Sequence, residues 1–274
     1  CGTQTAGLTA GGESVGTSSN LYDGTSWTAG ADMNTSRPNT GAVSGIQTSA
    51  LMSGGGSGGT PVGGKTELYD GTSWSEVADM SVGRYSSAGA NSGTTSASLA
   101  FGGYLGGTGY ISSTEEWNKT ANVITPAAFS SGGNMPEATS KVADGGTQTA
   151  AVEGGGQKNN PDSLPTSSSE YNGTSWTAGN SLPSSYGSNT GATGTQTALV
   201  TGGANNPTPG GTFEYDGTNW TAGGTLGTSR YGGKTLGTQT AAVTCGGRVS
   251  PPTVNNVEEY DGSSWTAVTA MPIA

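Results

Sequence analysis

The six residues Tyr22-Asp23-Gly24-Thr25-Ser26-Trp27 decide the fold, because the same pattern returns along the whole chain. Four further copies keep the tyrosine, the glycine and the tryptophan in place: they are Tyr69–Trp74, Tyr171–Trp176, Tyr215–Trp220 and Tyr260–Trp265. A sixth, degraded copy has Trp117 in the tyrosine column and Asn122 in the tryptophan column. Successive tyrosine-column residues are 47, 48, 54, 44 and 45 positions apart. The chain therefore consists of six related units.

A second motif precedes each aromatic pair and reads Gly-Thr-Gln-Thr, a short Ala/Leu/Val run and Gly-Gly. In the unit of Trp220 we predict a first strand over Tyr186–Ala192 and a second over Gln196–Gly202. The third strand ends at the tyrosine and the fourth begins at the tryptophan. The Asp-Gly pair between them predicts a turn with an Asx side-chain bond and a positive φ at the glycine.

Four short strands in a period of this length are typical of a β-propeller blade. We predict an all-β chain that forms one domain over residues 1–274, a six-bladed kelch-like β-propeller with four antiparallel strands in each blade. The blades are centred on the six tryptophans: Trp27, Trp74, Trp117, Trp176, Trp220 and Trp265.

The composition agrees with this fold and excludes several function classes. Apolar residues make up only 30% of the chain and glycine contributes 51 of 274 residues, which suits blades that pack closely through small side chains. Histidine is absent, so Ser-His-Asp hydrolysis and histidine-ligated metals are excluded, and we expect no cofactor and no catalytic metal. The nine Lys and Arg residues against a net charge of −10 argue against nucleic acid as a partner. No apolar run is long enough for membrane insertion.

The strand count predicts that blade one lacks its innermost strand. Cys1 falls at the start of a second strand, and only five first strands follow along the chain. The missing strand would come from the remainder of a longer protein, or from a neighbouring subunit by strand donation. The same register places Cys1 and Cys245 roughly 25 Å apart at ~3.3 Å per residue, so we expect no disulfide between them.

The order Gly-Gly, variable loop, Glu-Tyr-Asp, turn, Trp and Met-x-x-x-Arg resembles the kelch repeat over essentially the whole chain. That resemblance implies that the glycines, the tyrosine and the tryptophan serve packing rather than catalysis. The combination of Gly-Thr-Gln-Thr-Ala with Glu-Tyr-Asp-Gly-Thr-Ser-Trp-Thr-Ala-Gly also resembles repeats in large virion proteins of marine bacteriophages, where they are tail- or fibre-associated. The copper chemistry of galactose oxidase and the arginine triad of sialidases have no counterpart in this sequence.

The loops after Gly-Gly vary in length and content, whereas the strands stay constant. In a propeller these loops share one rim with the connections between blades, among them Val123–Pro136, and binding sites are often built on such loops. Aromatic and amide side chains suit sugars. The candidate ligand-binding residues are Tyr104, Tyr110, Lys158, Asn159, Asn160, Asn205, Asn206 and Arg248. We interpret the acid pairs Glu115-Glu116 and Glu258-Glu259 as one packed and one solvated strand residue each.

These observations predict a non-enzymatic structural or interaction domain of a phage virion or another extracellular assembly. Its expected partner is a host-surface glycan, a protein receptor, or another virion or filament subunit, bound through the variable rim loops. Two alternatives stay open: a cell-surface adhesin or filament subunit, and a carbohydrate-active enzyme that uses carboxylates on the rim.

Overall fold

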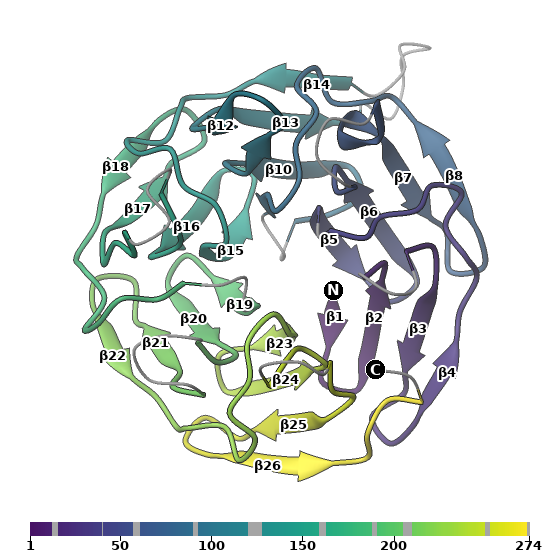
Figure 1. Cartoon of the computed structure of the whole chain (residues 1–274), viewed down its shortest axis with the longest axis vertical. Coiled ribbons are helices and arrows are strands. Elements are labelled where there is room, and N and C mark those ends of the chain that lie inside the picture. The colour runs from purple at the N-terminus through teal and green to yellow at the C-terminus, as the bar shows by residue number, and fades with distance from the viewer. Residues whose placement is uncertain are drawn as a thin grey trace.

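The computed structural model describes residues 1–12, 16–39, 41–56, 61–89, 93–119, 128–158, 163–187, 191–204, 210–249 and 253–272. Six four-stranded antiparallel sheets stand as blades around a central axis (Figure 1). Each blade runs outward from an innermost strand to an edge strand at the circumference of the ring. The six-bladed propeller predicted from the repeat is confirmed.

In each of the first three blades, the strands follow one another from the axis outward in chain order, with the innermost strand first. Blade one holds β1 (Gly2–Thr3), β2 (Ala6–Ala10), β3 (Ser19–Tyr22) and β4 (Trp27–Ala29). Blade two holds β5 (Ala42–Ile46), β6 (Ser49–Ser53), β7 (Thr66–Tyr69) and β8 (Trp74–Val77). Blade three holds β9 (Ala88–Gly89), β10 (Ala97–Phe101), β13 (Thr114–Asn118) and β14 (Ala128–Ser131).

The other three blades follow the same order. Blade four holds β15 (Ala143–Thr147), β16 (Ala150–Gly154), β17 (Ser168–Tyr171) and β18 (Trp176–Ala178). Blade five holds β19 (Ala192–Thr195), β20 (Ala198–Thr201), β21 (Phe213–Tyr215) and β22 (Trp220–Ala222). Blade six holds β23 (Lys234–Thr238), β24 (Ala241–Cys245), β25 (Val257–Tyr260) and β26 (Trp265–Val268).

Two smaller elements lie in the connections. The hairpin of β11 (Tyr104–Leu105) and β12 (Gly109–Tyr110) stands between β10 and β13. A single 3₁₀ turn, η1 (Pro61–Gly64), precedes β7, and the described residues contain no α-helix.

The first strand of each blade lies later in the sequence than predicted. In blade five it is β19, whereas the prediction ended that strand at Ala192, and Gln196 lies in the turn before β20 rather than in a strand. The Gly-Thr of the motif thus ends the innermost strand. Its glycine is required: Gly237 has a φ of 111°, and a Cβ there would lie 2.3 Å from the carbonyl oxygen of Ala241.

This shift also corrects the strand count in blade one. The prediction that the innermost strand is missing is wrong, because Gly2 and Thr3 form β1 and pair with Gly7 and Ala6 of β2. The strand has two residues, like β9 in blade three, whereas β5, β15 and β23 each have five. Because Gly-Thr ends an innermost strand, Gly2 and Thr3 belong to a first strand, and the number of first strands is six instead of the predicted five.

The two cysteines are free thiols, as predicted, although the reason given for it is wrong. Cys1 does not begin a second strand. It bonds to Leu8 from the innermost position, and the adjoining β1 packs beside β23 and β24, the strand that ends at Cys245.

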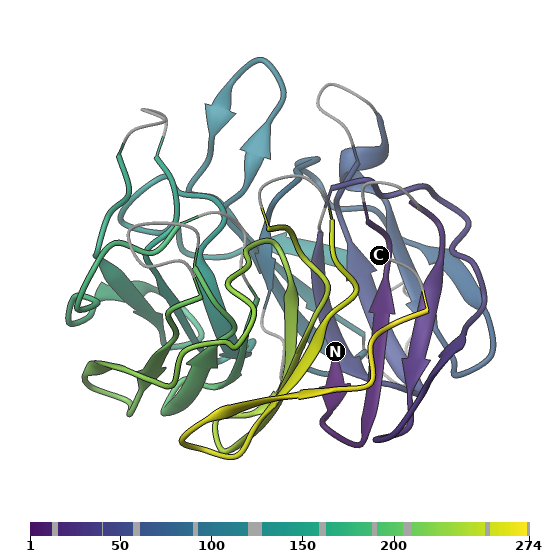
Figure 2. The ribbon, with the colours of Figure 1, turned by 60° about the horizontal axis from the view of Figure 1, so that its bottom comes forward.

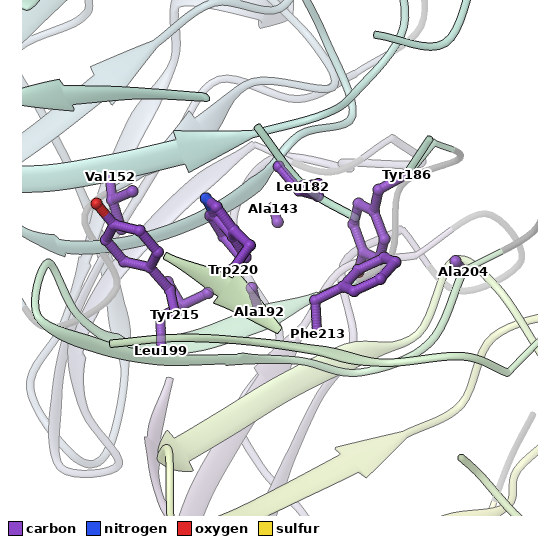
Figure 3. Packing of buried hydrophobic residues seen from close by; sticks show 10 residues of the cluster. All are labelled: Ala143, Val152, Leu182, Tyr186, Ala192, Leu199, Ala204, Phe213, Tyr215 and Trp220. Carbon is purple, nitrogen blue, oxygen red and sulfur yellow. The ribbon is translucent and has the colours of Figure 1, made fainter. Parts of the chain in front are cut away.

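The turn chemistry predicted between the third and fourth strands is confirmed. The carboxylate of Asp23 accepts hydrogen bonds from the backbone N–H of Thr25 at 2.9 Å and of Ser26 at 2.8 Å, and Gly24 has a φ of 94°. Across this turn Tyr22 and Trp27 stack with ring centroids 4.8 Å apart, and four other blades repeat the pair. These rings fill the space between blades, as Tyr215 and Trp220 do in Figure 3.

In the degraded repeat of blade three, the position that holds tryptophan in the other blades is filled by a phenylalanine that was not predicted from the sequence. Trp117 pairs with Phe129 of β14, with ring centroids 5.3 Å apart. Phe129 therefore takes the tryptophan position that we had assigned to Asn122, which lies outside the described residues. Part of Val123–Pro136 is consequently an outer strand and not a rim connection.

Among the described residues, hydrogen bonds from glutamine and tyrosine side chains join every blade except blade three to the one before it. Gln47, Gln148, Gln196 and Gln239 each donate to the backbone carbonyl of the tyrosine-column residue in the preceding blade, at 2.7 to 3.1 Å. The hydroxyls of Tyr22, Tyr171, Tyr215 and Tyr260 donate to glutamates of the preceding blade: Glu259, Glu116, Glu170 and Glu214. Burial first, and then Glu259, raise the pKa of Tyr22 to about 12.

Buried ion pairs add to three of the junctions between blades. Arg37 bonds Glu67 at 3.1 Å, Arg84 bonds Glu115 at 2.7 Å and Arg230 bonds Glu258 at 2.6 Å. Our interpretation of the acid pairs as one packed and one solvated residue therefore needs correction. In Glu115-Glu116 and Glu258-Glu259, the first acid is buried against an arginine and the second accepts a tyrosine hydroxyl.

Candidate functional site

We call one side of the ring the loop face: it carries the connections between second and third strands and those that lead to the next blade. Both kinds of connection leave from the same end of the antiparallel blades. Figure 2 shows this face uppermost, with the β11–β12 hairpin standing out from it. The hairpin comes from the loop that the sequence singled out after Gly102-Gly103.

The structure brings two of the predicted residues together on this hairpin and adds a third that we did not predict. Tyr104 lies against Tyr110 with ring centroids 5.3 Å apart in an edge-on arrangement. Tyr85, from the connection between blades two and three, also packs against Tyr104, with ring centroids 5.1 Å apart. We call Tyr85, Tyr104 and Tyr110 the tyrosine cluster. All three residues are partly exposed.

Backbone pairing holds the cluster in place. Tyr85 and Tyr104 form an isolated antiparallel bridge, with N–H···O distances of 3.1 and 2.9 Å in the two directions. Burial, followed by the two neighbouring tyrosines, raises the pKa of Tyr85, so its hydroxyl stays protonated at neutral pH. Tyr85 could have been found from the sequence. It directly follows Arg84, the arginine of the repeat, and this position lies in the connection between two blades.

Lys158 lies apart from the tyrosine cluster, in the next blade along the chain. Its ammonium bonds Glu137 at 2.8 Å, and Glu137 also accepts the hydroxyl of Ser167 at 3.0 Å. The hydrogen bond from Lys158 lowers the pKa of Glu137. This lysine is therefore part of a surface ion pair that links a blade connection to a loop.

Arg248 occupies the position in blade six that Tyr104 occupies in blade three. Its backbone bridges Tyr231, with N–H···O distances of 2.7 and 3.0 Å, and also Thr253. Blades three and six face each other across the ring, so Arg248 and the tyrosine cluster belong to separate regions of the loop face (Figure 1). The four remaining candidates, Asn159, Asn160, Asn205 and Asn206, lie outside the described residues.

A second feature is a cavity of about 260 Å³ at the centre of the ring. Innermost strands supply much of its wall, and the charged side chains in its lining are those of Asp144 and Lys234. The backbone N–H of Gly89 donates to Asp144 at 3.0 Å. Burial raises the pKa of Asp144 to about 6, although Lys234 opposes the shift, and burial lowers the pKa of Lys234.

Neither Asp144 nor Lys234 was among the residues predicted from the sequence. In the repeat, Lys234 stands where other innermost strands have Ala42, Ala88 or Ala143, each paired to the equivalent residue of its second strand. A charged residue in a column of alanines is the signal that could have revealed it. That signal appears only when the strands are aligned in the register observed here.

Within the described residues, no group of three or more Cys, Asp or Glu side chains is placed to hold a metal ion. No helix among them has the length and apolar content needed to cross a membrane.

Comparison with known proteins identifies the fold. No family model matches the chain, and no curated protein sequence matches it. Among solved structures, one described as the structure of YjhT superimposes with a TM-score of 0.72 over 97% of this chain and 94% of that chain, at 14% sequence identity. The chain is a six-bladed β-propeller similar in fold to YjhT, and at this identity the similarity extends to the fold alone.

Proposed function

We propose that this propeller is a non-enzymatic binding domain of a virion or another extracellular assembly, and that it recognises a host-surface glycan through the tyrosine cluster. The observation that carries the proposal is the gathering of three tyrosine rings at a hairpin that projects from the loop face. Tyrosine offers an apolar ring and a polar hydroxyl at a low cost in side-chain entropy, which suits it to binding surfaces.

The support for a bound sugar is chemical. A pyranose presents an apolar face of C–H groups and a rim of hydroxyls, and partly exposed aromatic rings with protonated hydroxyls complement both. The cluster is also rigid, because its strands pair and Tyr85 is bridged to Tyr104. A rigid platform loses little conformational entropy on binding.

The amino-acid sequence of the repeat supports a setting in a virion or another extracellular assembly. It resembles kelch repeats and, more narrowly, tail- or fibre-associated virion repeats. The same domain on a cell-surface adhesin or filament would use the cluster in the same way. The other partner that this face could bind is a neighbouring protein subunit. Glycan-array binding distinguishes a glycan partner from a protein partner.

The test is glycan-array binding of the full chain, compared with Tyr104→Ala and Tyr110→Ala. We expect each substitution to weaken binding by about tenfold or more, the usual loss when a central aromatic anchor is removed. Tyr231→Ala is the matched control, because Tyr231 holds the same place in its blade connection as Tyr85 and bridges Arg248 instead of a tyrosine. Equal glycan binding by both cluster variants and the wild type would overturn the proposal. Binding to a copurified subunit but to no glycan would overturn it as well.

A further inference from the structure

The turn between the third and fourth strands of blade four carries an amide where its counterparts carry a carboxylate. Its first residue is Asn172, and Asn172-Gly173 is the single Asn-Gly step in the sequence. In each of these turns the side-chain oxygen of the first residue accepts two backbone N–H groups. The counterparts of Asn172 are Asp23, Asp70, Asp216 and Asp261.

The side-chain amide of Asn172 is open to attack by the chain itself. Asn172 is exposed, and its Oδ1 accepts the backbone N–H of Thr174 at 3.0 Å and of Ser175 at 2.9 Å. Within the described part of the chain, the N–H of Gly173 and the side-chain NH₂ of Asn172 make no hydrogen bond. Glycine also has no side chain that could shield its nitrogen. The Gly173 nitrogen can therefore approach Cγ of the residue before it.

The two N–H donors assist this attack, because they lie where negative charge develops. As the Gly173 nitrogen bonds to Cγ, charge gathers on Oδ1, and N–H groups already aimed at such an oxygen stabilise the transition state. The equivalent turn of blade one shows how the same donors act on an anion. There the backbone N–H of Ser26, followed by that of Thr25, lowers the pKa of Asp23 to about 2.

We propose that Asn172 is a site of spontaneous deamidation and that the folded turn directs the product to aspartate. The Gly173 nitrogen gives up its proton and bonds to Cγ, the bond from Cγ to Nδ2 breaks, and ammonia leaves a succinimide ring. Water then adds at Cγ, the bond from Cγ to the Gly173 nitrogen breaks, and that nitrogen regains a proton. One water is consumed and one ammonia is released, with no oxidation or reduction.

The fold selects between two ways of opening the ring. Opening at the backbone carbonyl carbon instead of Cγ would give isoaspartate, with an extra methylene group in the main chain. The N–H groups of Thr174 and Ser175 polarise the carbonyl at Cγ and not the backbone carbonyl. The extra methylene would also disturb the pairing of Tyr171 with Trp176 across the turn. Aspartate, the residue of the other turns, is therefore the favoured product.

The test is incubation of the full chain at mildly alkaline pH, followed by peptide mapping with mass spectrometry that separates aspartate from isoaspartate. We expect more conversion at Asn172 than at any other asparagine. Asn219 is the internal control, because it is exposed in the equivalent turn of blade five but precedes Trp220 instead of a glycine. The ratio of aspartate to isoaspartate should be about tenfold higher in the folded chain than in urea, because the donors are fixed at Cγ only in the fold.

Asp216→Asn is the matched variant, because it places a second Asn-Gly step in a turn of the same geometry. Thr218 and Asn219 donate to Asp216 at 2.8 and 2.7 Å, so the introduced asparagine should convert as fast as Asn172 and return mainly to aspartate. The inference is overturned if Asn172 stays intact in the folded chain, if the folded and unfolded chains give the same product ratio, or if the variant yields mainly isoaspartate. These outcomes are independent of glycan binding, since the turn lies at the end of the blade opposite the loop face.

Discussion

The junction between blades two and three and the junction between blades four and five join equivalent surfaces with different chemistry. In the first, Arg84 is buried against Glu115. In the second, the same two positions hold Tyr186 and Phe213, whose ring centroids lie 5.8 Å apart (Figure 3). Because both junctions fit the same ring, the backbone geometry does not require the ion pair.

A third position changes together with these two. Where the acid is present, the residue after the repeat Met or Leu donates its backbone N–H to the carboxylate: Asn34 to Glu67, Ser81 to Glu115 and Gly227 to Glu258, at 2.7 to 2.8 Å. Where the acid is replaced by Ser169, Phe213 or Asn20, the residue at this position is Pro136, Pro183 or Pro272. Proline has no N–H to leave unsatisfied. At the five junctions where all three positions fall within the sequence, the arginine, the acid and the N–H donor are thus present or absent together.

The largest effect should follow from removing one member of such a set. We expect Arg84→Met to lower the free energy of unfolding by about 3–5 kcal/mol, because it leaves the Glu115 carboxylate buried without its cation. Denaturant unfolding of the full chain measures the change.

The control for Arg84→Met is Lys65→Met, which removes a lysine paired with Glu76 and Asp79 at the surface. That loss should stay below about 1 kcal/mol. If both substitutions cost the same, the buried pair contributes no more than an exposed one.

The junction between blades three and four should make stability depend on pH. It has Thr139 and Ser169 at the pair positions, yet it buries Glu153 next to Ser169. Burial raises the pKa of Glu153 to about 8, helped by Glu137 and Asp144 and opposed by Ser169. The folded protein therefore binds more protons than the unfolded chain between about pH 5 and 8. Stability should fall over that range, by an amount on the order of 3 kcal/mol.

Unfolding curves at a series of pH values test this dependence. In Glu153→Gln the fall in stability with rising pH should be much smaller. A variant that keeps the wild-type slope would show that Glu153 is not the group responsible.

The smallest effect concerns the proline. In a chain with Tyr186→Arg and Phe213→Glu, adding Pro183→Ser should restore about 1–2 kcal/mol, because the new N–H can donate to the introduced carboxylate. In the wild-type background the same substitution should not stabilise, since Phe213 accepts no hydrogen bond. The double-mutant cycle gives the coupling energy. A coupling of zero would mean that the proline and the acid vary independently.

The sequence was sufficient for the blade number, the Asp-Gly turns and the Tyr–Trp pairs, because each is a local pattern repeated at fixed spacing. It was insufficient for the strand boundaries. Thr-Gln-Thr suits a strand by composition, and only the contact of Gly237 with Ala241 reveals a turn. Phe129 was missed because an insertion displaced it from its column.

The candidate site was predicted less completely. Tyr104 and Tyr110 could be found because they share one short loop, whereas Tyr85 lies on another connection and joins them only in three dimensions. The sequence could not show that Asp144 and Lys234 line one cavity. Their strands belong to blades four and six, which blade five separates, and they come together only around the axis of the folded ring.

The hydrogen bond from Tyr22 to Glu259 has a consequence for the order of folding. It joins residues 237 positions apart, whereas the corresponding bonds of Tyr171, Tyr215 and Tyr260 span 45 to 55 positions. Contacts between successive blades can form while the chain is still an open arc, but the contact between blades six and one requires both ends of that arc to meet. The entropy lost in closing such a long loop makes this the late, slow step. Until it is complete, the facing surfaces of blades one and six stay exposed to other chains.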